Sequence, residues 1–129
     1  MKKKINSKWA RILGASLLLS TVTVMTSYAG SWQKDGRGWW WQEDNGSWPA
    51  NQWKYIHGTW YAFDGNGYMR TGWYWDGRSW YYLTGSGAMV EGWAYIGGSW
   101  YYMVPGNGAM VGAGWHLIDN SWYYMNGSG

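Results

Sequence analysis

Tryptophans recur through this chain in pairs whose members lie seven residues apart. The first members are Trp32, Trp53, Trp73, Trp93 and Trp115, and the second members are Trp39, Trp60, Trp80, Trp100 and Trp122. A large apolar residue recurs later in the pattern, at Met69, Met89 and Met110. Aromatic faces can attract a cation with about 0.5–2 kcal/mol per face, stack on sugar rings, or form core. A tryptophan considered alone is more often a core residue. Pairs that recur with the same spacing in every repeat instead favour a role in ligand binding.

The tryptophan pairs define five repeats, with steps of 21, 20, 20 and 22 residues between their first members. Such a period is typical of arrays in which each repeat is one supersecondary unit. Turn-forming residues lie near the middle of the repeats, at 34–37, 57–58, 76–77, 97–98 and 119–120. The flanking segments are short and rich in residues that favour strands. Each repeat is therefore predicted to be a β-hairpin, followed by a glycine-rich connection.

A lone hairpin is only marginally stable in water, but similar hairpins can bury one another's aromatic faces. We therefore predict an all-β fold, a solenoid of five stacked β-hairpin repeats of about 20 residues. Strand alternation places Trp80 and Tyr82 on one face of a hairpin and Tyr81 on the other. The pattern does not decide which face belongs to the core.

The first 29 residues differ in character from the repeats. Five basic residues precede an uncharged apolar stretch from Ile12 to Met25, and Ser27 and Ala29 supply small residues before a cleavage point. This order predicts a secretory signal peptide, residues 1–29, and a mature repeat module, residues 30–129. The mature part has five basic and seven acidic residues, a net charge of −2. We therefore expect no nucleic-acid partner, and no membrane partner after cleavage.

Residues that could perform catalysis or bind a metal are sparse. His57 and His116 have no third ligand at a metal-binding spacing. The seven acidic residues mostly lie in turns or connections, and no two of them form a recognisable pair for glycoside hydrolysis. The chain has no cysteine, so no disulfide can staple an exported module. We expect no metal, no cofactor and no catalytic residue, and we interpret the chain as non-enzymatic.

The segments GWYWDGRSWYYLTGSGAMVEGW and GWAYIGGSWYYM resemble the choline-binding repeats of Gram-positive surface proteins, and the resemblance extends from Trp32 onward. It implies a hairpin solenoid that holds the choline groups of teichoic acids between successive hairpins. The protein would then be secreted and attached non-covalently to the cell wall. Related aromatic repeats occur in glucan-binding domains, so a carbohydrate-binding module is the alternative. A truncated targeting module of a larger wall hydrolase or adhesin is a further alternative.

The resemblance also implies how the sites are composed: two tryptophans of one repeat, the second-strand tryptophan of the next repeat, and a methionine. The first site would have Trp32, Trp39 and Trp60; the second Trp53, Trp60 and Trp80 with Met69; the third Trp73, Trp80 and Trp100 with Met89; and the fourth Trp93, Trp100 and Trp122 with Met110. On this assignment Trp60, Trp80 and Trp100 each serve two sites.

The first repeat departs from the pattern. It carries QEDNGSWPANQW where other repeats have Gly-Ala-Met, and Trp48 stands in the place of the methionine. Pro49 cannot donate a hydrogen bond to a sheet. This departure predicts that the first repeat acts as a cap. The oligomeric state is left open by the sequence.

Overall fold

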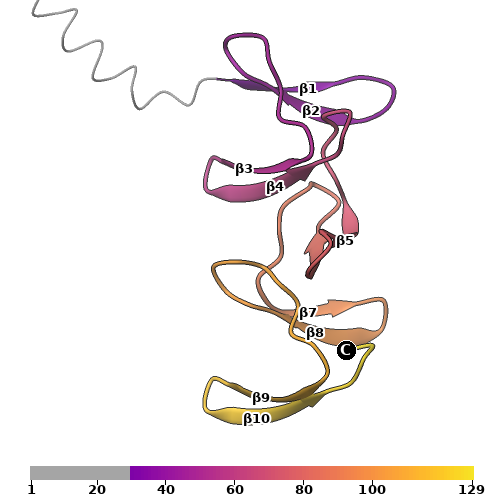
Figure 1. The fold of residues 1–129 in the computed structure, drawn as a ribbon, viewed down its shortest axis with the longest axis vertical. Helices are drawn as coiled ribbons and strands as arrows, with labels where there is room; N and C mark the ends of the chain where they lie inside the picture. The colour runs from indigo at the N-terminus through magenta and orange to yellow at the C-terminus, as the bar shows by residue number, and fades with distance from the viewer. Residues whose placement is uncertain (1–29) are drawn as a thin grey trace, which may run out of the picture. The chain divides into compact units, whose positions relative to one another are not determined.

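Short strands rich in tryptophan and tyrosine pair across turns, and the resulting hairpins follow one another along the chain (Figure 1). The computed structural model describes residues 30–129, and the predicted signal peptide, residues 1–29, lies outside them. The strand pairs are β1 (Ser31–Lys34) with β2 (Trp39–Gln42), β3 (Gln52–Ile56) with β4 (Thr59–Phe63), β5 (Gly72–Trp75) with β6 (Trp80–Leu83), β7 (Gly92–Ile96) with β8 (Ser99–Met103), and β9 (Gly114–Ile118) with β10 (Ser121–Met125). They confirm the predicted all-β solenoid of five hairpins.

Three of the hairpins turn over two residues that both have positive φ. The φ values are 48° and 85° at His57–Gly58, 59° and 91° at Gly97–Gly98, and 48° and 64° at Asp119–Asn120. Two successive residues of positive φ match the twist of the flanking strands, which explains the glycine, asparagine and aspartate found there. The other two turns are longer. In each of them an aspartate, Asp35 or Asp76, accepts hydrogen bonds from backbone N–H groups two and three residues later.

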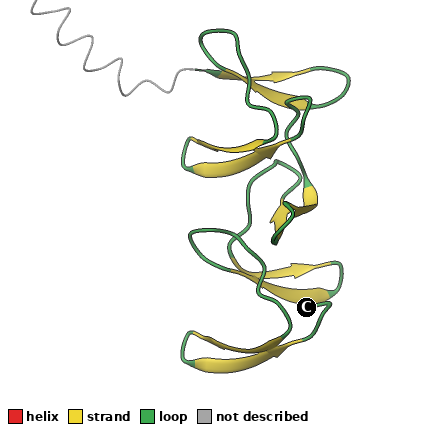
Figure 2. Ribbon diagram, in the orientation of Figure 1, coloured by secondary structure: helices red, strands yellow, loops and turns green. Residues whose placement is uncertain are grey.

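Each hairpin is a separate two-stranded sheet, and within the described range no named strand of one hairpin pairs with a named strand of another (Figure 2). In the second hairpin Trp53 lies opposite Ala62 and Tyr55 lies opposite Trp60, so these four side chains share one face. Tyr61, which is next to Trp60, belongs to the other face. The hairpins must therefore be joined by side-chain packing and by their connections.

The packing joins unlike faces of successive hairpins. The Trp32 ring of the first hairpin lies 4.8 Å from that of Tyr61 and 6.0 Å from that of Phe63, measured between centroids. Trp32 and its cross-strand partner Trp41 share a face of the first hairpin, and Tyr61 and Phe63 share a face of the second. Tyr61, the residue that follows the second-strand tryptophan, therefore points back toward the preceding hairpin.

The buried core lies at the end of each second strand from the second hairpin onward. Phe63, Leu83, Met103 and Met125 are at most 4% exposed, and they end β4, β6, β8 and β10. Burying a side chain of this kind contributes about 1.5–3 kcal/mol. The other buried apolar residues in the described range are Trp41, Ile56, Ala62 and Ile118. The tryptophans predicted to bind ligand are not among these residues and keep part of their surface accessible.

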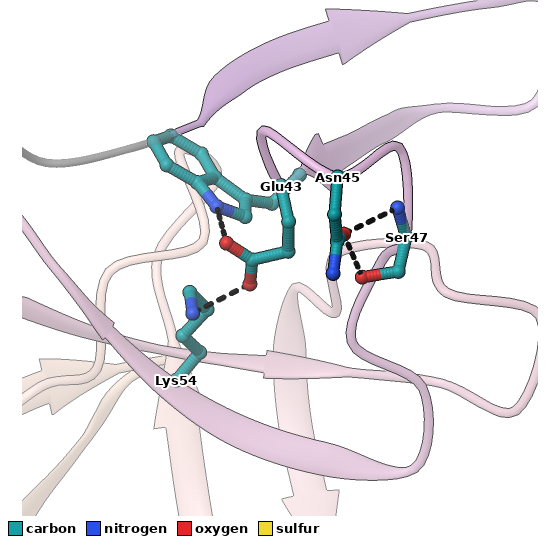
Figure 3. Close-up of polar contacts among 5 residues, drawn as sticks. Glu43, Asn45, Ser47 and Lys54 are labelled. Carbon is teal, nitrogen blue, oxygen red and sulfur yellow. Dashed lines mark hydrogen bonds and ion pairs between the residues drawn. The ribbon is translucent and has the colours of Figure 1, made fainter.

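Glu43 connects the first hairpin to the second (Figure 3). Its Oε2 accepts a hydrogen bond from Nε1 of Trp41 at 3.2 Å, and its Oε1 lies 2.6 Å from Nζ of Lys54 in β3. In the same connection the Asn45 side chain accepts hydrogen bonds from the backbone N–H and the hydroxyl of Ser47. The divergent segment of the first repeat thus forms its own set of polar contacts.

Glycines in the connections allow each connection to pass close to the one before it. Gly87 and Gly108 have φ values of 82° and 72°. A Cβ atom at Gly87 would collide with the side chain of Met69, and one at Gly108 would collide with that of Met89. The absence of a side chain at these glycines therefore makes room for the preceding methionine. Residues 30–129 include no helix with the length and apolar character needed to cross a membrane.

Candidate aromatic binding sites

The first aromatic pocket lies between the first and second hairpins. It has a volume of about 350 Å³ and is lined by Trp32, Trp39, Tyr61 and Met69, together with Gly85 and Ser86 of the third repeat. Trp32 and Tyr61 meet edge to face, with an angle of 66° between their planes. Three successive repeats thus contribute to one pocket.

The second aromatic pocket repeats this arrangement one hairpin later. It has a volume of about 250 Å³ and is lined by Trp53, Trp60, Tyr81 and Met89, with Gly106 and Asn107 of the fourth repeat. The Trp53 and Tyr81 rings are 4.9 Å apart. A larger hollow of about 420 Å³ shares Trp60, Met89 and Gly106 with this pocket and is also lined by Tyr55 and Glu91. Glu91 belongs to this hollow and not to the lining of the second pocket, and its Oε1 accepts a hydrogen bond from the Gly106 N–H at 3.1 Å.

The next two hairpin interfaces contain the same tryptophan–tyrosine contact, and there the two tryptophans of the pair also contact each other. At the third interface Trp73 lies 6.2 Å from Trp80 and 4.7 Å from Tyr101. At the fourth, Trp93 lies 6.4 Å from Trp100 and 4.8 Å from Tyr123. Two tryptophans of one hairpin and a tyrosine of the next therefore form the repeated aromatic unit.

A backbone hydrogen bond fixes each methionine beside a pocket tryptophan. The N–H groups of Met69, Met89 and Met110 donate to the carbonyl oxygens of Trp39, Trp60 and Trp80 at 2.7, 3.0 and 2.8 Å. Each of these hydrogen bonds links the glycine-rich connection of one repeat to the second strand of the repeat before it. This contact assigns Met69 to the first interface, Met89 to the second and Met110 to the third.

The structure brings the predicted site residues together in groups that differ from the expected ones in two respects. The third aromatic wall is the tyrosine that follows the second-strand tryptophan: Tyr61 lines the first pocket, in which Trp60 was expected. Since neighbouring strand residues face opposite ways, Trp60 faces the third hairpin and lines only the second aromatic pocket. Each methionine also lies one interface earlier than expected, because its N–H donates to the tryptophan of the preceding repeat.

Trp122, the expected third wall of the fourth site, is not the residue that forms the ring contact between the fourth and fifth hairpins. That ring contact is made by Tyr123, while Trp122 is 64% exposed and pairs across its hairpin with Leu117. The sequence contained the signal for the four tyrosines. They follow the second-strand tryptophans directly, and strand alternation turns them toward the previous hairpin.

Aromatic neighbours across the second, third and fourth hairpins contact the second-strand tryptophans. The ring centroids of Tyr55 and Trp60 are 5.2 Å apart, those of Trp75 and Trp80 5.4 Å, and those of Tyr95 and Trp100 5.2 Å. In the first hairpin the Nζ of Lys34 lies 5.4 Å from the centroid of Trp39. These residues stand two positions after the first tryptophan of each pair. Sequence reasoning missed them, although strand register places them opposite the second tryptophan.

The wall tyrosine of the second pocket is held in its neutral form. Partial burial is the main cause that raises the pKa of Tyr81, and the negative charge of Asp76 adds to it. The pKa of Asp76 is itself lowered, mainly by the backbone N–H groups of Ser79 and Arg78. Within residues 30–129 there is no group of three metal-ligating side chains. The pockets therefore offer neutral aromatic faces and sulfur, a lining suited to binding apolar or cationic groups.

Family comparisons agree with this geometry. Residues 71–115 match the choline-binding repeat family, and residues 51–69 and 113–129 match a cell wall binding repeat family. Together these matches cover more than half of the chain. The chain belongs to the choline-binding repeat family. Choline-binding repeats form binding domains, and the ones in this chain coincide with the hairpins that build the aromatic pockets.

Several solved structures share these repeats. The multimodular pneumococcal cell wall endolysin from phage Cp-1, complexed with choline, is 49% identical with a TM-score of 0.65, covering 76% of this chain and 29% of that protein. Choline-binding protein F from Streptococcus pneumoniae is 46% identical with a TM-score of 0.71, covering 77% of this chain and 33% of that protein. A curated lysozyme of Streptococcus phage Cp-1 is 50% identical over 30 residues, which are 23% of this chain and 9% of the lysozyme. The chain thus spans a third or less of each relative.

Proposed function

We propose that each complete aromatic pocket of this chain holds one choline group. The first pocket would use Trp32, Trp39, Tyr61 and Met69, and the same positions would serve at the later interfaces. The lining of the first two pockets carries this proposal. Among the described residues, no charged side chain lines either pocket, and three aromatic side chains do so in each.

The chemistry of choline matches such a lining. Its trimethylammonium group carries a positive charge but no N–H, so a carboxylate cannot receive a hydrogen bond from it. Aromatic faces attract the dispersed charge and bury the methyl groups, and a desolvated face contributes up to about 2 kcal/mol. The methionine completes the apolar wall with a polarisable sulfur.

The physiological ligand on this proposal is the choline of cell wall teichoic acid. The signal peptide expected at residues 1–29 would export the chain, and the repeats would then hold it non-covalently on the wall. The chain would act as a non-catalytic binding module, by itself or as the targeting part of a larger wall hydrolase or adhesin. The relatives support this, because the phage endolysin was solved with choline and combines the repeats with further modules.

Calorimetric titration of choline into three forms of the protein tests the proposal. We expect Tyr81→Ala to lower the number of bound cholines by one, because Tyr81 walls the second pocket. Tyr124→Ala is the matched control: Tyr124 packs on Trp115 within the fifth hairpin, is 61% exposed, and should leave the stoichiometry unchanged.

The same titration distinguishes the carbohydrate-binding alternative. Sugar rings also stack on tryptophan, so dextran oligosaccharides are titrated in parallel. Heat released by dextran without any released by choline would reject choline as the ligand. Equal stoichiometry in Tyr81→Ala and the parent protein would reject Tyr81 as a cage wall.

A further inference from the structure

A further pocket lies where the first hairpin meets the connection of the second repeat. Its Trp40, Trp48 and Asn66 stand at the positions that Tyr61, Met69 and Ser86 occupy in the first aromatic pocket, but no pair of tryptophans from a preceding hairpin lines it. Its volume is about 210 Å³, and it is lined by Asp35, Trp40, Trp48, Asn66 and Tyr68. The Trp40 and Trp48 rings lie 5.9 Å apart at 76°. We call it the Asp35 pocket. None of its five lining residues belongs to the lining of the first two aromatic pockets.

The Asp35 pocket is built from departures of the first two repeats from the common pattern. Trp40 stands where the other repeats have tyrosine, and Trp48 stands where three of them have methionine. Tyr68 replaces the alanine found at the matching positions 88 and 109. A Cβ atom at Gly67 would collide with the Trp48 ring, so that glycine makes room for Trp48 against the second connection. A backbone bridge between Trp40 and Tyr68 brings these two residues together.

Asp35 gives this pocket a carboxylate held in a defined orientation. Its Oδ1 accepts hydrogen bonds from the N–H groups of Arg37 and Gly38 at 2.8 and 3.2 Å, and its Oδ2 accepts one from the Tyr68 hydroxyl at 2.8 Å. These bonds, that of the Arg37 N–H foremost, lower the pKa of Asp35 and keep it ionised. The Arg37 guanidinium partly offsets the negative charge. Each carboxylate oxygen can accept more than one hydrogen bond, so Oδ2 can also accept one from a ligand.

The difference in lining indicates a difference in ligand. Aromatic faces without a carboxylate suit a quaternary ammonium, whereas aromatic faces beside a carboxylate suit a cation that can also donate N–H hydrogen bonds. We propose that the Asp35 pocket binds a small protonated amine with free N–H groups, with Asp35 accepting its hydrogen bond and Trp40, Trp48 and Tyr68 contacting its charge and methylenes. This site is independent of the choline sites proposed above.

Ethanolammonium and choline form a matched pair of probes, because they differ only in the three N-methyl groups. The indole N–H signals of the protein are followed by NMR during titration with each, and are assigned by single Trp→Phe variants. We expect ethanolammonium to shift the signals of Trp40 and Trp48 first. We expect choline to shift those of Trp53 and Trp60 first.

Two variants test the role of the carboxylate. Asp35→Asn keeps the size of the side chain but loses the charge-assisted hydrogen bond, and we expect ethanolammonium to bind the Asp35 pocket about tenfold more weakly. Choline binding at Trp53 and Trp60 should not change. Tyr68→Phe keeps the ring and removes the competing hydroxyl donor, so ethanolammonium binding should be retained.

Three outcomes would overturn the proposal. The first is an absence of ethanolammonium-dependent shifts at Trp40 and Trp48. The second is equal affinity of the two probes for this pocket. The third is a loss of binding in Tyr68→Phe as large as that in Asp35→Asn, since the loss would then reflect disturbed local packing.

Discussion

The carboxylate of Glu43 contacts one residue in each of two hairpins. It accepts the N–H of Trp41, which is only 2% exposed, and pairs with the partly exposed Lys54. Glu43→Ala would leave the Trp41 N–H buried without an acceptor, and we expect it to lower the free energy of unfolding by about 1–3 kcal/mol. Lys54→Ala removes only the ion pair and should cost about 0–1 kcal/mol. Denaturant unfolding measures both, and equal costs would contradict the hydrogen-bonding role.

The hydrogen bonds that Asp76 accepts predict that acid destabilises the third hairpin. The backbone N–H groups of Ser79 and Arg78 lower its pKa below the ordinary value of 3.8. A carboxyl group whose pKa is lower in the folded state stabilises the fold above its unfolded pKa, and this contribution is lost as the pH falls through the folded value. The stability difference between the parent and Asp76→Asn should therefore be constant near neutral pH. It should shrink as the pH falls from about 4 downward, measured by thermal unfolding at a series of pH values. A difference that grows in acid would contradict this.

The residues that line the aromatic sites were only partly predictable. Both tryptophans of each pair are recognisable because their spacing of seven recurs in every repeat. The tyrosine walls were missed, although strand alternation already placed Tyr81 and Trp80 on opposite faces. The deciding information is which face meets the preceding hairpin, and this depends on packing between distant residues such as Trp53 and Tyr81.

At the scale of the elements, successive connections lie close to one another and contribute, with the strand side chains, to the packing of neighbouring hairpins. Gly87 and Gly46 occupy equivalent places in their connections, with φ values of 82° and 84°. A Cβ atom at Gly46 meets nothing within 4 Å, whereas one at Gly87 collides with Met69. Substitutions at these two glycines therefore distinguish the cost of backbone strain from the cost of a steric clash.

We expect Gly46→Ala to destabilise the protein by about 1 kcal/mol through the positive φ alone. Gly87→Ala should cost more, because Met69 must also move. It should also weaken choline binding in the first pocket, which Met69 lines. Chemical unfolding and choline titration of both variants measure these effects. If both variants cost the same and bind choline equally, Met69 does not depend on Gly87.

The hairpins themselves were predictable because their turns are local. His57–Gly58, Gly97–Gly98 and Asp119–Asn120 have the residue types that tolerate positive φ, and the structure turns at those positions. The hydrogen bond from Met89 to Trp60 was not predictable, since it joins residues of different repeats and leaves no local sequence signal. The departure in the first repeat was visible in the sequence, but its contribution to the Asp35 pocket was not.

At the scale of the whole repeat module, the proposed choline sites lie on a single chain, so weak affinities at individual sites would combine. A ligand polymer that enters one pocket raises the effective concentration of its other groups near the next pocket. Tyr61→Ala, Tyr81→Ala and Tyr101→Ala, introduced one after another, should therefore reduce retention on a surface of immobilised choline by a large factor at each step. The affinity of each remaining pocket for free choline should stay nearly constant, as calorimetry can show. Retention that does not fall after all three substitutions would contradict multivalent binding.

The first two aromatic pockets each draw residues from three successive repeats, as the first one does from Trp32, Tyr61 and Gly85. A gene made of such repeats can therefore change length by unequal recombination between neighbouring copies. A duplication within the array would insert one hairpin and one further cage, while pockets more than two repeats away would keep all their residues. A deletion would remove a cage in the same way. Selection could thus adjust how strongly the protein is retained on a polymeric surface by changing the number of repeats, without altering any individual site.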